Sequence, residues 1–130
     1  MRRSGSDLVN IGERERAVRR WIGIGGLALG TALTWVLVSR GEPAAWWWGL
    51  VFFVLYAQSV RLVLDGQTGT DLLKAELGEQ NLDGYFTLRG EPIEDPQVAG
   101  LLRHLSRRAT TFAIVAGVLL AAVSLWTVAL

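Results

Sequence analysis

Hydrophobic residues along this chain gather into three long runs, instead of recurring at the spacing of a helix or strand with one wet face. The runs cover residues 21–38, 44–64 and 109–130. Eighteen helical residues, the length of the first run, reach about 27 Å, close to the thickness of a hydrocarbon core. Because backbone polar groups in lipid must be satisfied within the segment, each run is predicted to be helical. The pattern predicts an all-α integral membrane protein with three transmembrane helices.

One formal charge, Arg61, stands inside these runs. We expect its side chain to snorkel toward the headgroups, which lets residues 62–64 continue the second span. A signal peptide is the alternative interpretation of the first run. The basic residues before the run fit that alternative, but the run is too long and no cleavage-site pattern precedes the next span.

The distribution of lysine and arginine predicts the orientation. Six basic residues precede the first span, namely Arg2, Arg3, Arg14, Arg16, Arg19 and Arg20. The turn between the first two spans holds only Arg40. Six more basic residues follow, from the end of the second span to the start of the third: Arg61, Lys74, Arg89, Arg103, Arg107 and Arg108. By the positive-inside rule, the N-terminus and the long loop face the cytoplasm and the C-terminus faces the periplasm or the exterior.

Tryptophan supports the same orientation, since indole rings favour the headgroup level. Trp21 stands at the inner boundary of the first span. The other five fall near the outer boundary, at Trp35, Trp46, Trp47, Trp48 and Trp126. A ligand-stacking box formed by residues 46–48 is the alternative interpretation.

Residues 1–20 are expected to form a solvated juxtamembrane helix that leads into the first span. Asn10 stands three residues before Glu13, the spacing of a capping box. Glu15 and Arg19 are four residues apart and can pair on one helix face.

Residues 65–108 are expected to form a cytoplasmic loop and an amphipathic helix. A small helix is predicted at residues 71–77, with Thr70 as its cap and Gly78 as its stop. Residues 85–88 are predicted to form a short strand. Asp95 followed by Pro96 indicates the start of a helix that continues through Arg108 into the third span.

Small residues recur every three or four positions in the first and third spans. The positions are Gly23, Gly26, Gly30, Ala113, Gly117 and Ala121. Membrane helices associate where small residues let their backbones approach. These spans are expected to run parallel, so the two faces could meet inside one chain or between two copies.

The N-terminal part resembles the YgaP-like transmembrane family. Residues 10–19 read Asn-Ile-Gly-Glu-Arg-Glu-Arg-Ala-Val-Arg, and the family opens with Asn, a small aliphatic residue, Gly, an acid and two arginines in this order. A glycine-rich span follows, here with Gly23, Gly25, Gly26 and Gly30. The resemblance covers roughly residues 8–64 and implies a bacterial inner-membrane domain that tends to dimerise. The family is best known as the anchor of a rhodanese-type sulfurtransferase. This chain lacks the cysteine that many members carry and adds a loop and a third span.

Few residues have side chains suited to catalysis or metal binding. There is no cysteine, and a zinc site is not expected around the single histidine, His104, for which surface placement is predicted. The loop acids, from Asp65 to Asp95, fit no calcium-loop spacing and are expected to be solvated. In the spans, Gln58 is expected to hydrogen-bond with Thr31 and Thr34 across a helix interface. No cofactor or metal is expected, and the net charge of +1 gives no attraction to nucleic acid.

The sequence therefore predicts a non-enzymatic scaffold or accessory subunit of the bacterial inner membrane, acting as a homo-oligomer or within a larger complex. The alternative is an oligomeric small-solute channel or transporter component, and an enzyme using loop carboxylates is a third, weaker hypothesis. Seven arginines are expected to contact anionic headgroups at the cytoplasmic face: Arg14, Arg16, Arg19, Arg20, Arg103, Arg107 and Arg108.

Overall fold

A computed structural model describes residues 9–41, 45–81 and 90–130. Within them the elements are α1 (Glu13–Arg40), α2 (Trp47–Thr68), α3 (Leu72–Leu77), β1 (Glu79–Gln80), β2 (Glu91–Pro92) and α4 (Pro96–Ala129). The three long helices, α1, α2 and α4, are each long and apolar enough to cross a membrane. The predicted all-α membrane architecture is confirmed.

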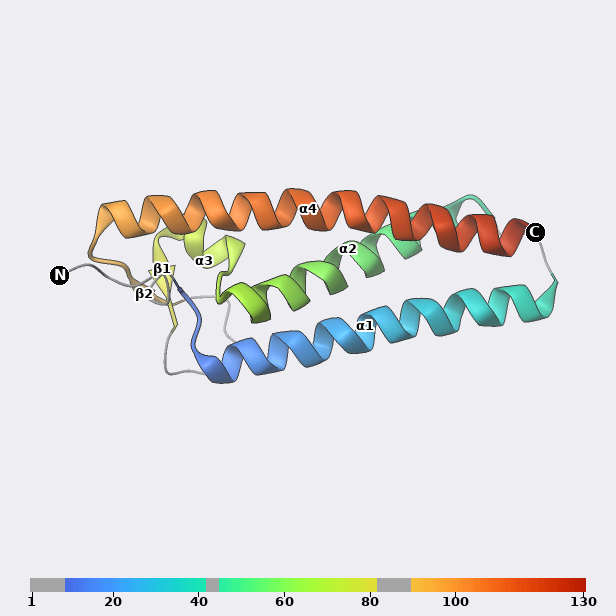
Figure 1. Ribbon diagram of the computed structural model, residues 1–130, viewed down its shortest axis with the longest axis horizontal. Helices are drawn as coiled ribbons and strands as arrows, with labels where there is room; N and C mark the ends of the chain where they lie inside the picture. The colour runs from blue at the N-terminus through green and yellow to red at the C-terminus, as the bar shows by residue number, and fades with distance from the viewer. Residues whose placement is uncertain (1–8, 42–44, 82–89) are drawn as a thin grey trace.

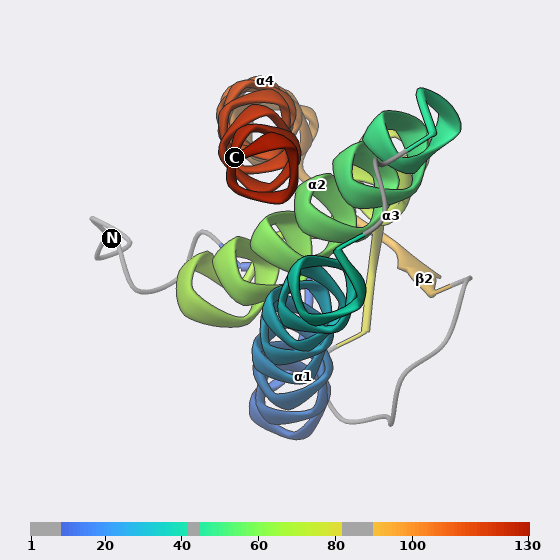
Figure 2. The ribbon, with the colours of Figure 1, turned by 90° about the vertical axis from the view of Figure 1, so that its right-hand side faces the viewer.

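The long helices lie side by side with α2 between α1 and α4 (Figures 1 and 2). Helix α4 has 34 residues and is about 51 Å long, against about 30 Å for a hydrocarbon core. Its first three turns therefore reach beyond the span, next to α3 and the two short strands at the left of Figure 1.

Local signals explain most helix ends. Gly41, Gly69 and Gly78 adopt positive φ angles of 65°, 72° and 67° as the C-caps of α1, α2 and α3, a conformation in which a Cβ would be strained. At the start of α4, the Asp95 side chain accepts a hydrogen bond from the Gln97 backbone N–H and Pro96 follows it. The predicted stop at Gly78 and the predicted start at Asp95 are both confirmed.

Two predicted caps are wrong. The N-cap of α1 is Gly12, without a side-chain hydrogen bond, because the Asn10 side chain bonds with the backbone of Asp71 instead. The N-cap of α3 is Asp71, whose carboxylate accepts from the Lys74 backbone N–H, and not Thr70. The strand predicted at residues 85–88 lies outside the described residues.

Three segments meet beyond the ends of α1 and α2. Strand β1 pairs antiparallel with β2, with Glu79 opposite Pro92, and Ile11 forms a parallel bridge with Asn81. We call residues 9–12, 69–81 and 90–95 the cap.

The small residues of α1 and α4 let helix backbones approach closely. Both of these small-residue faces pack against α2. A Cβ added at Gly23 would lie 2.6 Å from the Ser59 carbonyl oxygen, and one added at Gly117 would lie 2.6 Å from the Ala57 Cβ. Gly26 approaches Ser59 and Gly30 the Tyr56 ring, and Ala113 and Ala121 are buried in α4. The expectation that the faces of the first and third spans meet each other within the chain is wrong. The hairpin turn places α2 next to α1, and α4 packs on the other side of α2.

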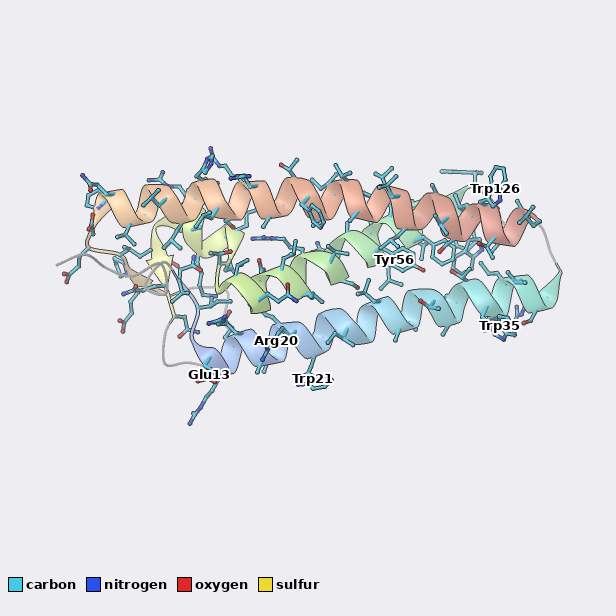
Figure 3. All side chains as sticks on the ribbon, in the orientation of Figure 1. Glu13, Arg20, Trp21, Trp35, Tyr56 and Trp126 are labelled. Carbon is cyan, nitrogen blue, oxygen red and sulfur yellow. The ribbon has the colours of Figure 1, made fainter. Side chains whose placement is uncertain are left out.

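The hydroxyl contacts in the spans differ from those predicted. Ser124 hydrogen-bonds with Thr34 at 3.0 Å and with the Tyr56 hydroxyl at 2.9 Å, so Tyr56 lies among all three helices (Figure 3). Thr31 donates to the Leu27 carbonyl in its own helix, and Gln58 is exposed on α2. The predicted bonds from Gln58 to the threonines are therefore wrong, since Gln58 points away from α1.

Candidate functional site

Six charged side chains come together between the bundle and the cap, and we call them the charge cluster. They are Glu15 and Arg19 of α1, Arg61 and Asp65 of α2, and Asp71 and Lys74 of the cap. No member is more than 8% exposed. Three carboxylates thus face three cations in a place that water barely reaches.

Arg19 is the centre of the charge cluster. Its guanidinium Nη2 lies 2.6 Å from Glu15 Oε1, and its Nη1 lies 2.9 Å from Asp65 Oδ2. Nη2 also pairs with the Asp71 carboxylate. One side chain therefore joins α1, α2 and the cap.

The Glu15 carboxylate also contacts a second cation, Lys74, and the side-chain amide of Asn81. Its Oε1 lies 3.0 Å from Lys74 Nζ, and its Oε2 accepts a hydrogen bond of 2.7 Å from the Asn81 side chain. Both Glu15 and Lys74 are fully buried. A carboxylate at the start of α1 thus holds two parts of the cap, α3 and the residue that follows β1.

Arg61 extends the cluster to α4. Its Nη2 lies 2.8 Å from Asp65 Oδ1 and donates to the Ser106 hydroxyl at 2.7 Å. The Arg61 guanidinium is therefore held inside the bundle, and the prediction that it snorkels to the headgroups is wrong. Asp65 and Asp71, predicted to be solvated, are buried because each neutralises an arginine.

Hydrogen bonds around the cluster fix the cap further. The Asn10 side chain donates to the Asp71 carbonyl and accepts from the Asp71 N–H, at 3.1 and 2.8 Å. Arg16 donates to the carbonyls of Gly66 and Gln67 at the end of α2. Removing one partner from such a buried network is costly, because it leaves another charge or donor unsatisfied.

A separate ion pair lies on the surface of the cap. Arg107 of α4 donates two hydrogen bonds to the Glu76 carboxylate of α3, at 2.5 and 2.8 Å. These bonds lower the pKa of Glu76 below its ordinary value. Because solvent screens exposed pairs, this contact stabilises the protein far less than the buried ones.

The arginines predicted to contact headgroups have different surroundings. Arg19 belongs to the charge cluster, so the expectation for it is wrong, and Arg16 is half-buried on the α2 carbonyls. The remaining five are exposed near the cap: Arg14, Arg20, Arg103, Arg107 and Arg108. Trp21 adjoins Arg20 and points outward from α1, while Trp35 and Trp126 lie at the far end of the bundle (Figure 3).

Sequence reasoning missed the charge cluster, although a signal for it was present. Three pairs of opposite charges stand three or four residues apart at the ends of the spans: Glu15 with Arg19, Arg61 with Asp65, and Asp71 with Lys74. Each pair alone is typical of a solvated helix face. What the spacing does not show is that the three pairs lie against one another.

The charged groups of the cluster are engaged with one another. All three carboxylates are ion-paired, and His104 is exposed on α4. Within residues 9–41, 45–81 and 90–130, no three histidine or carboxylate side chains are grouped to hold a metal ion. No family model, curated protein or solved structure matches this chain.

Proposed function

We propose that this chain is a non-enzymatic scaffold or accessory subunit of the bacterial inner membrane, in which the helix bundle holds the cap at a fixed position on the cytoplasmic surface. The charge cluster is the observation that carries this proposal. A cap bound through Arg19, Glu15 and Lys74 to two membrane helices cannot move independently of them. Such rigidity suits a surface that positions a partner.

The cap also exposes apolar side chains that a partner would cover. Leu73 and Leu77 stand four residues apart on α3 and are 46% and 49% exposed, although they lie beyond the apolar spans. The two leucines lie on one face of α3, and we propose that they form part of an apolar contact with a partner. The resemblance to a dimerising membrane domain is consistent with a second copy or a larger complex as the partner.

Co-purification tests the scaffold function. The chain, purified from native membranes, is expected to carry a partner protein or a second copy of itself in a stoichiometric amount. The double variant Leu73→Asn with Leu77→Asn should lose most of that partner, about tenfold or more, while Glu13→Gln, exposed at the start of α1, should keep it. A monomer without any stoichiometric partner in the wild type would contradict the proposal.

The proposed orientation places the cap in the cytoplasm, as the basic residues near the cap favour. A reporter that is active only in the cytoplasm is expected to work when fused at Met1 and to fail when fused at Leu130. Activity at Leu130 with inactivity at Met1 would reverse the orientation and move the cap outside.

A small-solute channel formed by several copies is the alternative. A groove of about 590 Å³ lies along α1, α2 and α4, and Thr31, Thr34, Ser124 and Thr127 contribute hydroxyl-bearing side chains to its lining. The rest of the lining is apolar and these hydroxyls bond within the chain, so a channel requires several copies to turn them toward a shared path. Solute uptake into proteoliposomes that falls in a Thr31→Val, Thr127→Val double variant would favour the channel over the scaffold.

A further inference from the structure

A second cavity, of about 250 Å³, lies between α2 and α4 and opens to the surface of the bundle. Its α2 side includes Phe53, Gln58 and Arg61, and its α4 side includes Thr110 and Ile114. Arg61 bonds with Ser106, so its end of the cavity is the one near the cap. Phe53 lies eight residues back along α2, about 12 Å deeper in the span.

The cavity is therefore polar at its end near the cap and apolar toward the middle of the bundle. Its polar end carries the guanidinium of Arg61 and the amide of Gln58, and its apolar end the side chains of Phe53 and Ile114. This order of polarity is that of a phospholipid, which has a charged headgroup at the surface and acyl chains below it.

One nitrogen of the Arg61 guanidinium lacks an acceptor. Its Nη2 lies 2.8 Å from Asp65 Oδ1 and donates to Ser106, while its buried Nη1, like Asp65 Oδ1, has no hydrogen-bond partner within the described part of the chain. A buried charged donor without an acceptor costs more than a bond left unmade at the surface. Since the cavity adjoins this side chain, an occupant with an anionic oxygen would satisfy the guanidinium.

The surroundings favour an anionic occupant over a zwitterionic one. Arg103, Arg107 and Arg108 precede Thr110 on α4, and Arg107 pairs with Glu76 of α3. Asp65 balances Arg61 at this end of the cavity, while the next turns of α4 toward the cap carry three arginines against the single carboxylate of Glu76. An anionic headgroup is favoured by these arginines, because basic residues near a membrane surface attract anionic lipid.

We propose that this cavity is a binding site for one anionic phospholipid, whose phosphodiester bonds with Arg61 and Gln58 and whose acyl chain lies along Phe53 and Ile114. Because Nη1 is buried in this structure, binding requires the Arg61 guanidinium to turn toward the cavity so that Nη1 reaches a phosphate oxygen. The site is distinct from the general attraction of surface arginines to lipid, because it requires the cavity as well as the charge. It also goes beyond the scaffold function and does not depend on it.

Native mass spectrometry of the full chain in detergent tests the site, with phosphatidylglycerol and phosphatidylcholine of identical acyl chains as probes. One phosphatidylglycerol is expected to stay bound per chain at concentrations where phosphatidylcholine does not. Inorganic phosphate is the third probe and is expected neither to bind nor to displace the lipid. Equal retention of the two lipids, or displacement by phosphate, would overturn the proposal.

Two variants separate the site from the fold. Arg61→Gln removes the proposed phosphate ligand, but it also breaks the contacts with Asp65 and Ser106 and can destabilise the bundle. Ile114→Trp fills the cavity and leaves Arg61 in place. Its matched control is Ile24→Trp, because both isoleucines are 47% exposed. Ile114→Trp is expected to retain phosphatidylglycerol about tenfold less than Ile24→Trp. Equal retention by these two variants would overturn the cavity as the site.

Discussion

Replacing Glu15 with glutamine is expected to destabilise the protein by about 3–5 kcal/mol, the range for breaking a buried ion pair by removing one partner. Among the described residues, the neutral amide removes the nearer carboxylate of the buried Lys74 ammonium, leaving Asp71 at 3.9 Å, and one of the three carboxylates that pair with Arg19. Thermal unfolding in detergent measures the change.

Glu13→Gln is the matched control for this variant. Glu13 stands two residues earlier on the same helix and is exposed, so its loss should change stability by no more than about 0.5 kcal/mol. If the two variants unfolded at the same temperature as the wild type, the cluster would not hold the cap and the structural argument would fail.

The second large effect is expected at the glycines that face α2. In Gly23→Ala the new Cβ meets the Ser59 carbonyl oxygen at 2.6 Å, and in Gly117→Ala it meets Ala57 Cβ at 2.6 Å and Cα at 2.9 Å. Backbone atoms cannot rotate away, so the helices must separate. We expect a loss of about 1–3 kcal/mol for each variant, as for other overpacked sites.

Two glycines with open surroundings are the controls. A Cβ added at Gly25 or Gly100 meets nothing within 4 Å. Gly25→Ala and Gly100→Ala should keep or slightly raise the unfolding temperature, because alanine favours a helix by about 1 kcal/mol over glycine. Thermal unfolding in detergent that ranks all four variants alike would show that these glycines do not control the helix contacts.

The parts of the fold that could be predicted are those that depend on local sequence. An uncharged apolar run of about twenty residues must form a helix in lipid, whatever its neighbours are. Helix-capping signals are local too. Asp95 with Pro96 starts α4 and Gly78 ends α3, and both effects depend only on residues a few positions away.

The site could not be predicted because it depends on contacts between distant segments. Arg61 at the end of an apolar run is typical of a snorkelling side chain, and only the position of Ser106, 45 residues later, shows that the guanidinium points inward. Asn10 has the spacing of a helix cap, yet the Asp71 backbone lies within its reach and takes both of its hydrogen bonds. The sequence likewise did not show that the glycine-bearing faces of α1 and α4 both pack against α2, because this too is a contact between distant segments.

Hydrogen–deuterium exchange of the intact protein in lipid nanodiscs tests most directly whether the cap is held rigidly on the bundle. The informative amides are those of Gly12, Asn81 and Ile93, which donate to the carbonyls of Asn81, Asn10 and Gly78 at 2.6–2.7 Å. We predict that these amides exchange far more slowly than those of an unstructured peptide, and that Glu15→Gln removes this protection while leaving α2 and α4 protected. Exchange of the three wild-type amides at the rate of an unstructured peptide would contradict a rigid cap.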